Sequence, residues 1–260
     1  MMSAALKTID INSDLGESFG AWRMGDDDAL LAVVSSANIA CGFHGGDPDI
    51  MRRTVALAAA HDVAIGAHVS LPDLQGFGRR EMAVTPSEAY ALTLYQIGAL
   101  HGFTLAAGTR LRHVKPHGAL YNMAARDLAL AEAIATAVCD FDPSLRLFGL
   151  AGSCLIEAGR STGLAVVAEA FADRGYRSDG SLQPRREPGA LITENDDAIA
   201  QAMAMAREGK VRAVDGDIVE LQADSLCVHG DGAHAVAFAR NLRAALEAAG
   251  IAVVAPGGHP

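Results

Sequence analysis

Three basic side chains alternate along the run His113-Val-Lys-Pro-His117, which ends at a glycine before a helix-like segment. Successive side chains on a strand point to opposite faces, so His113, Lys115 and His117 would share one face. Burying such groups is costly unless anions, a metal or a substrate lie opposite them. We therefore expect a binding or catalytic site around this run.

Other candidate strands also end in residues suited to acid–base or ligand-binding chemistry. Asp10, Asn12 and Asp14 alternate along the first strand, and later strands lead to Asn38, His44, His68, Glu169, Asp173, Arg174, His229 and Asp231. In a parallel β/α barrel the active site forms at the carboxyl ends of the strands. A single histidine there is more often structural, but random placement does not bring such residues to one rim from five strands.

Two segments that contain both glycine and arginine, 70–82 and 170–188, follow candidate strands without an obvious helix. Long loops in compact domains are more often lids or binding loops than idle connections. A solvated loop is the simplest interpretation of their arginines. Bidentate capture of an anionic substrate is the alternative that we favour for Arg79 and Arg174.

Short apolar runs alternate with longer Ala-rich segments, which predicts β/α units and a parallel sheet in a single domain, 1–260. We expect strands over 8–13, 36–42, 63–69, 111–117, 145–150, 164–169 and 225–229. Helices are predicted to start at Asp47-Pro48, at the capping box Thr85-Pro-Ser-Glu88 and near Thr193, and the last to span 232–249. Asp215-Gly216 favours a small hairpin within 211–222.

The composition limits the possible partners and the cellular compartment. Lys and Arg total 21 against 31 Asp and Glu, a net charge of −10, which disfavours nucleic acid and anionic membranes. Four scattered cysteines form no CxxC pair, and we expect reduced thiols. The sequence shows neither a signal peptide nor a membrane-spanning apolar run, so we expect a cytoplasmic protein that acts on a small molecule.

Several signatures of common enzyme classes are missing. The chain has no GxxxxGK[ST] phosphate loop, no GxGxxG after the first strand, no GxSxG nucleophile elbow and no HExxH zinc helix. The basic and acidic residues at the strand ends, without any of these signatures, indicate only a small anionic ligand with a hydrolysable bond.

Taken together, these segments resemble the LamB/YcsF family in their order and over almost the whole chain. The matching segments are DINSDLGESFG (10–20), SANIACGFHGGDP (36–48), IGAH (65–68), GFGRR (76–80), HVKPHGALYN (113–122), FADR (171–174) and CVHGD (227–231). Long gapless segments of this kind are a highly specific signal.

The resemblance implies a TIM-like β/α barrel, with seven strands instead of eight, related to the glycoside hydrolase and deacetylase superfamily. It also implies ATP-dependent opening of the 5-oxoproline (pyroglutamate) lactam to L-glutamate, a 5-oxoprolinase reaction performed with two partner subunits, B and C. ATP is then the expected cofactor, and a divalent metal is an open possibility. The missing phosphate loop is compatible with a nucleotide bound mainly by the partners.

This chemistry suggests a role for each candidate residue. Asp14 and Glu169 would serve as acid, base or ligand, and Lys115, His117 and Arg174 would stabilise negative charge. Three histidines, His44, His68 and His229, would position water, substrate or a metal. The expected substrate-binding residues are Asn12, Asn38, Arg79, Tyr121, Asp173, Arg174 and Asp231.

Two other functions remain open from the sequence. A metal-dependent deacetylase or amidohydrolase acting alone would use Asp14, His44 and His68 as ligands, a mixed oxygen and nitrogen set that suits zinc with an open position. A non-catalytic subunit that presents a small anion to its partners would use the same residues, because a binding pocket and an active site share their chemistry.

Overall fold

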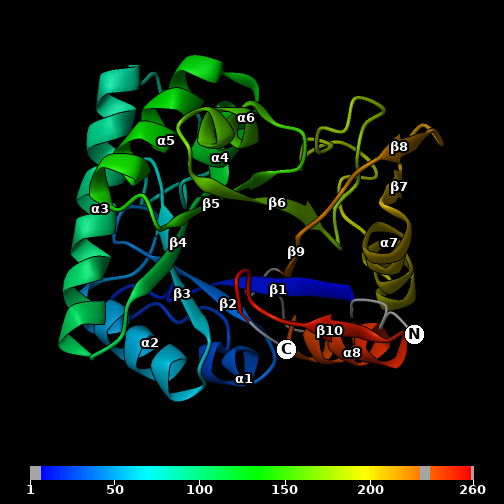
Figure 1. Cartoon of the computed structure of the whole chain (residues 1–260), viewed down its shortest axis with the longest axis horizontal. Helices are drawn as coiled ribbons and strands as arrows, with labels where there is room; N and C mark the ends of the chain where they lie inside the picture. Colours follow the sequence, from blue (N-terminus) through cyan, green and yellow to red (C-terminus); the bar gives the residue numbers. More distant parts are fainter. Residues whose placement is uncertain (1–6, 229–234, 259–260) are drawn as a thin grey trace, which may run out of the picture.

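The computed structural model describes residues 7–228 and 235–258, and its centre is a closed barrel of seven parallel strands (Figure 1). Neighbouring strands pair in the order β1-β2-β3-β4-β5-β6-β9, and β9 pairs with β1 to close the barrel. These strands span Lys7–Leu15 (β1), Ser36–Ala40 (β2), Ala64–Val69 (β3), Leu111–Pro116 (β4), Arg146–Leu150 (β5), Ala165–Phe171 (β6) and Ser225–Val228 (β9). The predicted seven-stranded β/α barrel is confirmed.

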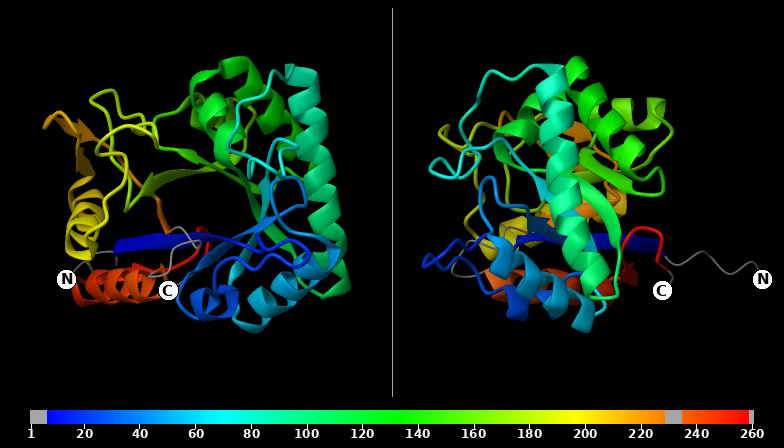
Figure 2. Two further views of the ribbon diagram at one scale, coloured as in Figure 1. Left: turned by 180° about the vertical axis from the view of Figure 1, so that it is seen from behind. Right: turned by 90° about the vertical axis from the view of Figure 1, so that its left-hand side faces the viewer.

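Helices surround the barrel on its outside (Figures 1 and 2). They span Asp27–Leu31 (α1), Pro48–Ala60 (α2), Pro86–Ala106 (α3), Gly118–Arg126 (α4), Leu128–Phe141 (α5), Cys154–Ser161 (α6), Asn195–Glu208 (α7) and Ala235–Ala248 (α8). Within the described ranges, no helix is both long enough and apolar enough to cross a membrane.

Three predicted helices start where expected to within two residues, and in one of them the capping residue differs from the predicted one. Asp47 caps α2 by accepting a hydrogen bond from the Ile50 amide, and Thr85 forms both halves of its capping box at the start of α3. Helix α7 instead has Glu194 as its N-cap, so Thr193 lies outside the helix. The expected first turn of the last helix, from residue 232, lies outside the described residues.

Three elements complete the chain around this barrel. The predicted hairpin is present as the antiparallel pair β7, Lys210–Arg212, and β8, Ile218–Glu220. Strand β10, Ile251–Val253, pairs with the first residues of β1 and was not predicted, nor was the five-residue α1. Each is only a few residues long, which is too short for a clear periodic pattern.

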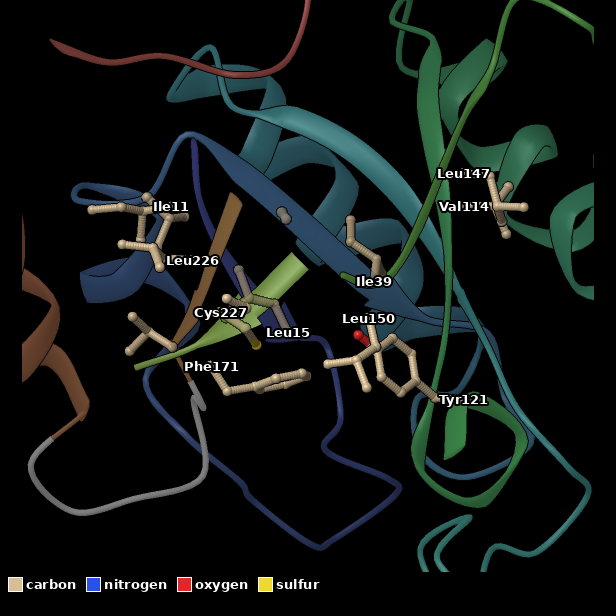
Figure 3. Packing of buried hydrophobic residues seen from close by; sticks show 14 of the residues in the cluster. Ile11, Leu15, Ile39, Val114, Tyr121, Leu147, Leu150, Phe171, Leu226 and Cys227 are labelled. Carbon is tan, nitrogen blue, oxygen red and sulfur yellow. The ribbon is translucent and has the colours of Figure 1, made fainter. Parts of the chain in front are cut away.

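Alternation along the strands separates an apolar outer layer from a polar interior. Ile11, Ile39 and Val114 belong to the buried hydrophobic cluster (Figure 3). Their neighbours Asn12, Asn38 and Lys115 hydrogen-bond to residues of other strands inside the barrel. The polar inner face predicted for the first strand is therefore present, and it carries the candidate site.

Candidate functional site

An ion triad at the centre of the barrel joins strands β1, β4 and β6. The Lys115 Nζ lies 2.7 Å from Glu169 Oε1 and 3.0 Å from Asp14 Oδ1. Burial alone would lower the pKa of Lys115, but the negative charges of Asp14 and Glu169 raise it well above its usual value. Burial likewise opposes ionisation of Asp14, yet His68 and Lys115 hold its pKa well below the usual range. Lysine and aspartate are therefore both charged.

A layer of amides fixes the triad from below. Asn12 Nδ2 donates to Glu169 Oε1 over 2.9 Å, while Asn38 Nδ2 donates to Asp14 Oδ1 over 2.9 Å and to Asn12 Oδ1 over 2.7 Å. Neither amide is among the described residues that line the cavity. The structure thus places Asn12 and Asn38, expected to bind substrate, where they orient the carboxylates.

The deepest residue of the histidine and lysine run, His113, belongs to the same layer. Its Nε2 lies 2.8 Å from Asn38 Oδ1, and its ring lies against Phe148 with 4.4 Å between the ring centroids. Burial, followed by the charge of Lys115, lowers the pKa of His113 to about 3. A neutral imidazole that donates to an amide oxygen gives His113 a structural role.

Above the triad, imidazoles and a carboxylate form a buried cluster of Glu17, His44, His68 and His117. His117 Nδ1 lies 2.9 Å from His68 Nε2, and the His44 ring stacks on His117 with centroids 3.7 Å apart. His44 Nε2 lies 3.0 Å from Glu17 Oε1. Burial and the neighbouring histidines lower the pKa of His44 and of His117 well below the usual value. One ligand atom from each residue lies within 4.8 Å of the others, so the cluster could bind a metal ion.

Tyr121 extends from α4 toward the far side of the triad. Its ring meets Phe171 edge-on, with centroids 5.8 Å apart (Figure 3). Burial and the negative charge of Glu169 raise the pKa of Tyr121 well above its usual value. The Tyr121 hydroxyl interacts with the Glu169 carboxylate, and apart from each other neither this hydroxyl nor Glu169 Oε2 has a hydrogen-bond partner among the described residues. These two buried polar atoms retain the capacity to bond a polar ligand.

Both long loops border one cavity of about 1400 Å³, whose lining includes Asp14, His68, Lys115 and His117. Although the chain is acidic overall, arginines are numerous in the wall of this cavity: Arg79, Arg126, Arg160, Arg174, Arg177, Arg185 and Arg186. Some of this charge is already balanced, for Arg126 meets Glu81 and Arg177 meets Glu187. Six acidic residues also belong to the described lining, so its eight Lys and Arg exceed its Asp and Glu by two, and this excess favours an anionic ligand.

The residues predicted on the two loops occupy different positions. Arg79 lines the cavity and lies over the Phe77 ring, 4.9 Å from its centroid. Arg174 is buried and donates to the carbonyls of Ala190 and Gln183, so part of its guanidinium holds the loop together. Burial lowers the pKa of Arg174 to about 10. Asp173 is half-buried and is not among the described lining residues.

A match to a known family covers nearly the whole chain: the LamB/YcsF family model aligns with residues 9–258. The chain belongs to the LamB/YcsF family. Curated relatives named as the A subunit of 5-oxoprolinase include a Bordetella pertussis protein, 62% identical over 247 residues that cover 95% of this chain and 98% of the relative. A Methylococcus capsulatus protein of the same name is 61% identical over 252 residues, covering 97% of each.

A solved structure of a relative has the same fold. The crystal structure of a lactam utilization protein from Thermus thermophilus superposes with a TM-score of 0.90 at 52% sequence identity, covering 95% of this chain and 99% of that one. The family match also covers 229–234, which the structure does not describe. The predicted residues His229 and Asp231 lie there, outside the described residues.

Glu17 and Cys227 are residues of this site that the sequence motifs did not single out. Glu17 lies three residues after Asp14, in the first matching segment, and its place directly beyond a strand was the signal available. Cys227 Sγ lies 3.3 Å from Lys115 Nζ, and burial raises the pKa of this thiol well above its usual value. Only the meeting of distant strands brings these atoms to the site.

Proposed function

We propose that this chain is the A subunit of an ATP-dependent 5-oxoprolinase, which opens the lactam of 5-oxo-L-proline to L-glutamate together with partner subunits B and C. Support comes from the relatives named as the A subunit of 5-oxoprolinase and from the lactam utilization protein with the same fold. The observation that carries the proposal is the charged Lys115, held by Asp14 and Glu169 at an arginine-lined cavity.

The requirement for ATP follows from the stability of the substrate. An unstrained five-membered lactam is a poor electrophile, and transfer of a phosphoryl group to the amide oxygen makes its carbon reactive toward water. The cavity, at about 1400 Å³, exceeds the roughly 300–1,000 Å³ of a typical small-molecule pocket. It therefore has room for 5-oxoproline and for phosphates that enter past the arginines.

In this proposal the charged groups have complementary roles. The Lys115 ammonium stabilises negative charge that develops on the substrate oxygen, as a preorganised donor in a buried site. Asp14 is ionised, so it accepts a proton or a hydrogen bond and does not act as the acid. Glu169 Oε2 and Tyr121 offer polar contacts to the lactam ring, and Arg79 faces the substrate carboxylate.

The imidazoles and the second loop arginine complete the proposed site. His68 and His117, at the cavity floor, position water or the phosphoryl group, and His44 supports them by stacking on His117. Arg174 contributes positive charge to the cavity wall while it holds the loop through two backbone carbonyls.

The test measures release of glutamate and ADP from 5-oxoproline and ATP, with this chain alone and with subunits B and C. We expect turnover only in the mixture, and loss of turnover with Lys115→Met or His44→Ala while the far-UV circular dichroism stays native. Lys210→Met, at a half-exposed lysine paired with Glu220, is the matched control and should keep full turnover.

Three outcomes would contradict the proposal. Near-normal turnover in both the Lys115 and His44 variants would refute the assigned site. Hydrolysis by this chain alone without ATP would indicate a stand-alone amidohydrolase. Binding of 5-oxoproline with no turnover in the complete mixture would indicate a non-catalytic binding subunit.

A further inference from the structure

Two imidazole nitrogens face each other at the cavity floor in a way that neutral rings cannot satisfy. His68 Nδ1 lies 3.0 Å from the Lys115 carbonyl oxygen, and His117 Nε2 lies 2.8 Å from the Phe77 carbonyl oxygen. A carbonyl oxygen only accepts hydrogen bonds, so both of these nitrogens carry the ring proton. The remaining atoms, His68 Nε2 and His117 Nδ1, are then two lone pairs only 2.9 Å apart.

A cation between the two nitrogens removes this repulsion, and the surrounding carboxylates favour a metal over a proton. A single proton shared between His68 Nε2 and His117 Nδ1 would be enough to relieve the repulsion between these two nitrogens. However, Glu17 Oε1 lies 3.5 Å from His117 Nδ1, and Asp14 Oδ2 lies 3.3 Å from His68 Nε2. Each of the two facing nitrogens therefore has a carboxylate oxygen within 3.5 Å, and the ligand atoms of Glu17, His68 and His117 lie within 4.8 Å of one another, as in a metal site with mixed nitrogen and oxygen ligands.

The separation of the nitrogens and their outer contacts also fit metal ligation. Two nitrogens bound at about 2.0–2.1 Å and at right angles would lie about 2.9 Å apart, as His68 and His117 do. Histidine ligands usually donate the other ring N–H to a carbonyl or a carboxylate, which fixes the tautomer. Both rings have this contact already.

We propose that Glu17, His68 and His117 bind a divalent first-row transition metal, with Asp14 as a further ligand on the Lys115 side. His44 is a positioning residue: its Nε2 contacts Glu17, and its ring stacks on His117. This ligand set differs from the one expected from the sequence, since it includes Glu17 and His117 and removes His44 from direct contact. A metal at this place would polarise a substrate carbonyl or phosphate oxygen.

The proposal does not depend on the lactam chemistry, and it is tested by binding without turnover. Untagged protein is stripped with chelator, incubated with Zn²⁺, Mn²⁺ or Co²⁺, desalted and analysed for bound metal, and affinity is measured by competition with a chromophoric chelator. We expect one tight site per chain. His68→Ala and His117→Ala should each weaken it by more than about 100-fold, and His44→Ala, as an outer contact, by about 10–100-fold.

Controls separate loss of ligands from loss of fold. His61→Ala removes an imidazole from the C-cap of α2, where its Nε2 lies 3.4 Å from Asp28 Oδ1 and away from the proposed ligands, and should leave affinity unchanged. Far-UV circular dichroism of each stripped variant checks folding, and added metal should raise the melting temperature of the wild type but not of His68→Ala. The proposal would be overturned if none of the three metals bound at one site per chain. It would also be overturned if the His68→Ala and His117→Ala variants bound metal as tightly as the wild type.

Discussion

Replacing Lys115 with methionine tests the central ion triad by its effect on stability. The lysine is 2% exposed and its ammonium contacts both Asp14 and Glu169, which come from two other strands. Methionine keeps most of the side-chain volume and removes the charge. Two carboxylates then remain in the barrel without the cation that balanced them.

The structure sets the size and the sign of the expected change. Removing one partner of a buried ion pair costs about 3–5 kcal/mol, because the other charge stays buried without compensation. For a chain of this size the loss corresponds to a melting temperature lower by roughly 6–20 °C. The double variant Lys115→Met/Glu169→Gln, in which one of the two charges is gone, should recover part of this loss.

The dependence of stability on pH should also change sign. In the wild type the pKa of Asp14 lies well below its unfolded value of 3.8, so its contribution to stability is present above pH 3.8 and is lost as the pH falls. Without the lysine, burial raises the carboxylate pKa in the folded state. The variant should then be relatively more stable in acid and lose stability as the pH rises.

Urea unfolding followed by circular dichroism at several pH values measures both effects. Lys210→Met is the matched control, because its exposed pair with Glu220 should contribute less than about 1 kcal/mol. If Lys115→Met unfolds at the same urea concentration as the wild type, with the same trend in pH, the carboxylates are not held by this lysine and the reasoning fails.

Two further variants test the barrel interior. Burial raises the pKa of Asp10 from 3.8 to about 6, so this carboxyl group stabilises the fold below pH 3.8, and its contribution is lost as the pH rises to about 6. Asp10→Asn should abolish this part of the pH dependence of stability measured by urea unfolding. An unchanged pH profile would contradict this prediction. In Gly66→Ala the new Cβ would overlap the His113 ring, so thermal unfolding should show a loss of about 1–3 kcal/mol in stability. Stability equal to the wild type would show that the ring moves freely.

Most elements of the fold were predictable, because their signals are local. The apolar runs of the barrel strands and the caps Asp47 and Thr85 depend on residues that are near in the sequence. The cap of α7 was missed because both Thr193 and Glu194 precede acidic helical residues, and sequence alone does not show which one takes the cap geometry. Strand β10 forms only because the edge of β1 over Lys7–Ile9 is left open by the other strands.

Most members of the candidate site were predictable, Glu17 and Cys227 being the exceptions, and its contacts were less so. His68, Lys115, His117 and Asp14 meet as expected, because residues at the carboxyl ends of parallel strands converge. Asn12 and Asn38 were expected to bind substrate, but hydrogen bonds between strands turn them toward the carboxylates. The roles of His229 and Asp231 stay predictions, since both residues lie outside the described residues.

The sequence by itself determined the alternation of strands and helices, the polar face of the first strand and the kinds of chemistry available at the strand ends. These follow from residue type and from the periods of the backbone, which act over a few neighbours. Only the tertiary structure decided which groups pair: Lys115 with Glu169, Glu17 with His44, and His68 with His117. Closure of the barrel sets these contacts, because it brings side chains from distant segments to within about 3 Å, where protonation and hydrogen bonding depend on the neighbour.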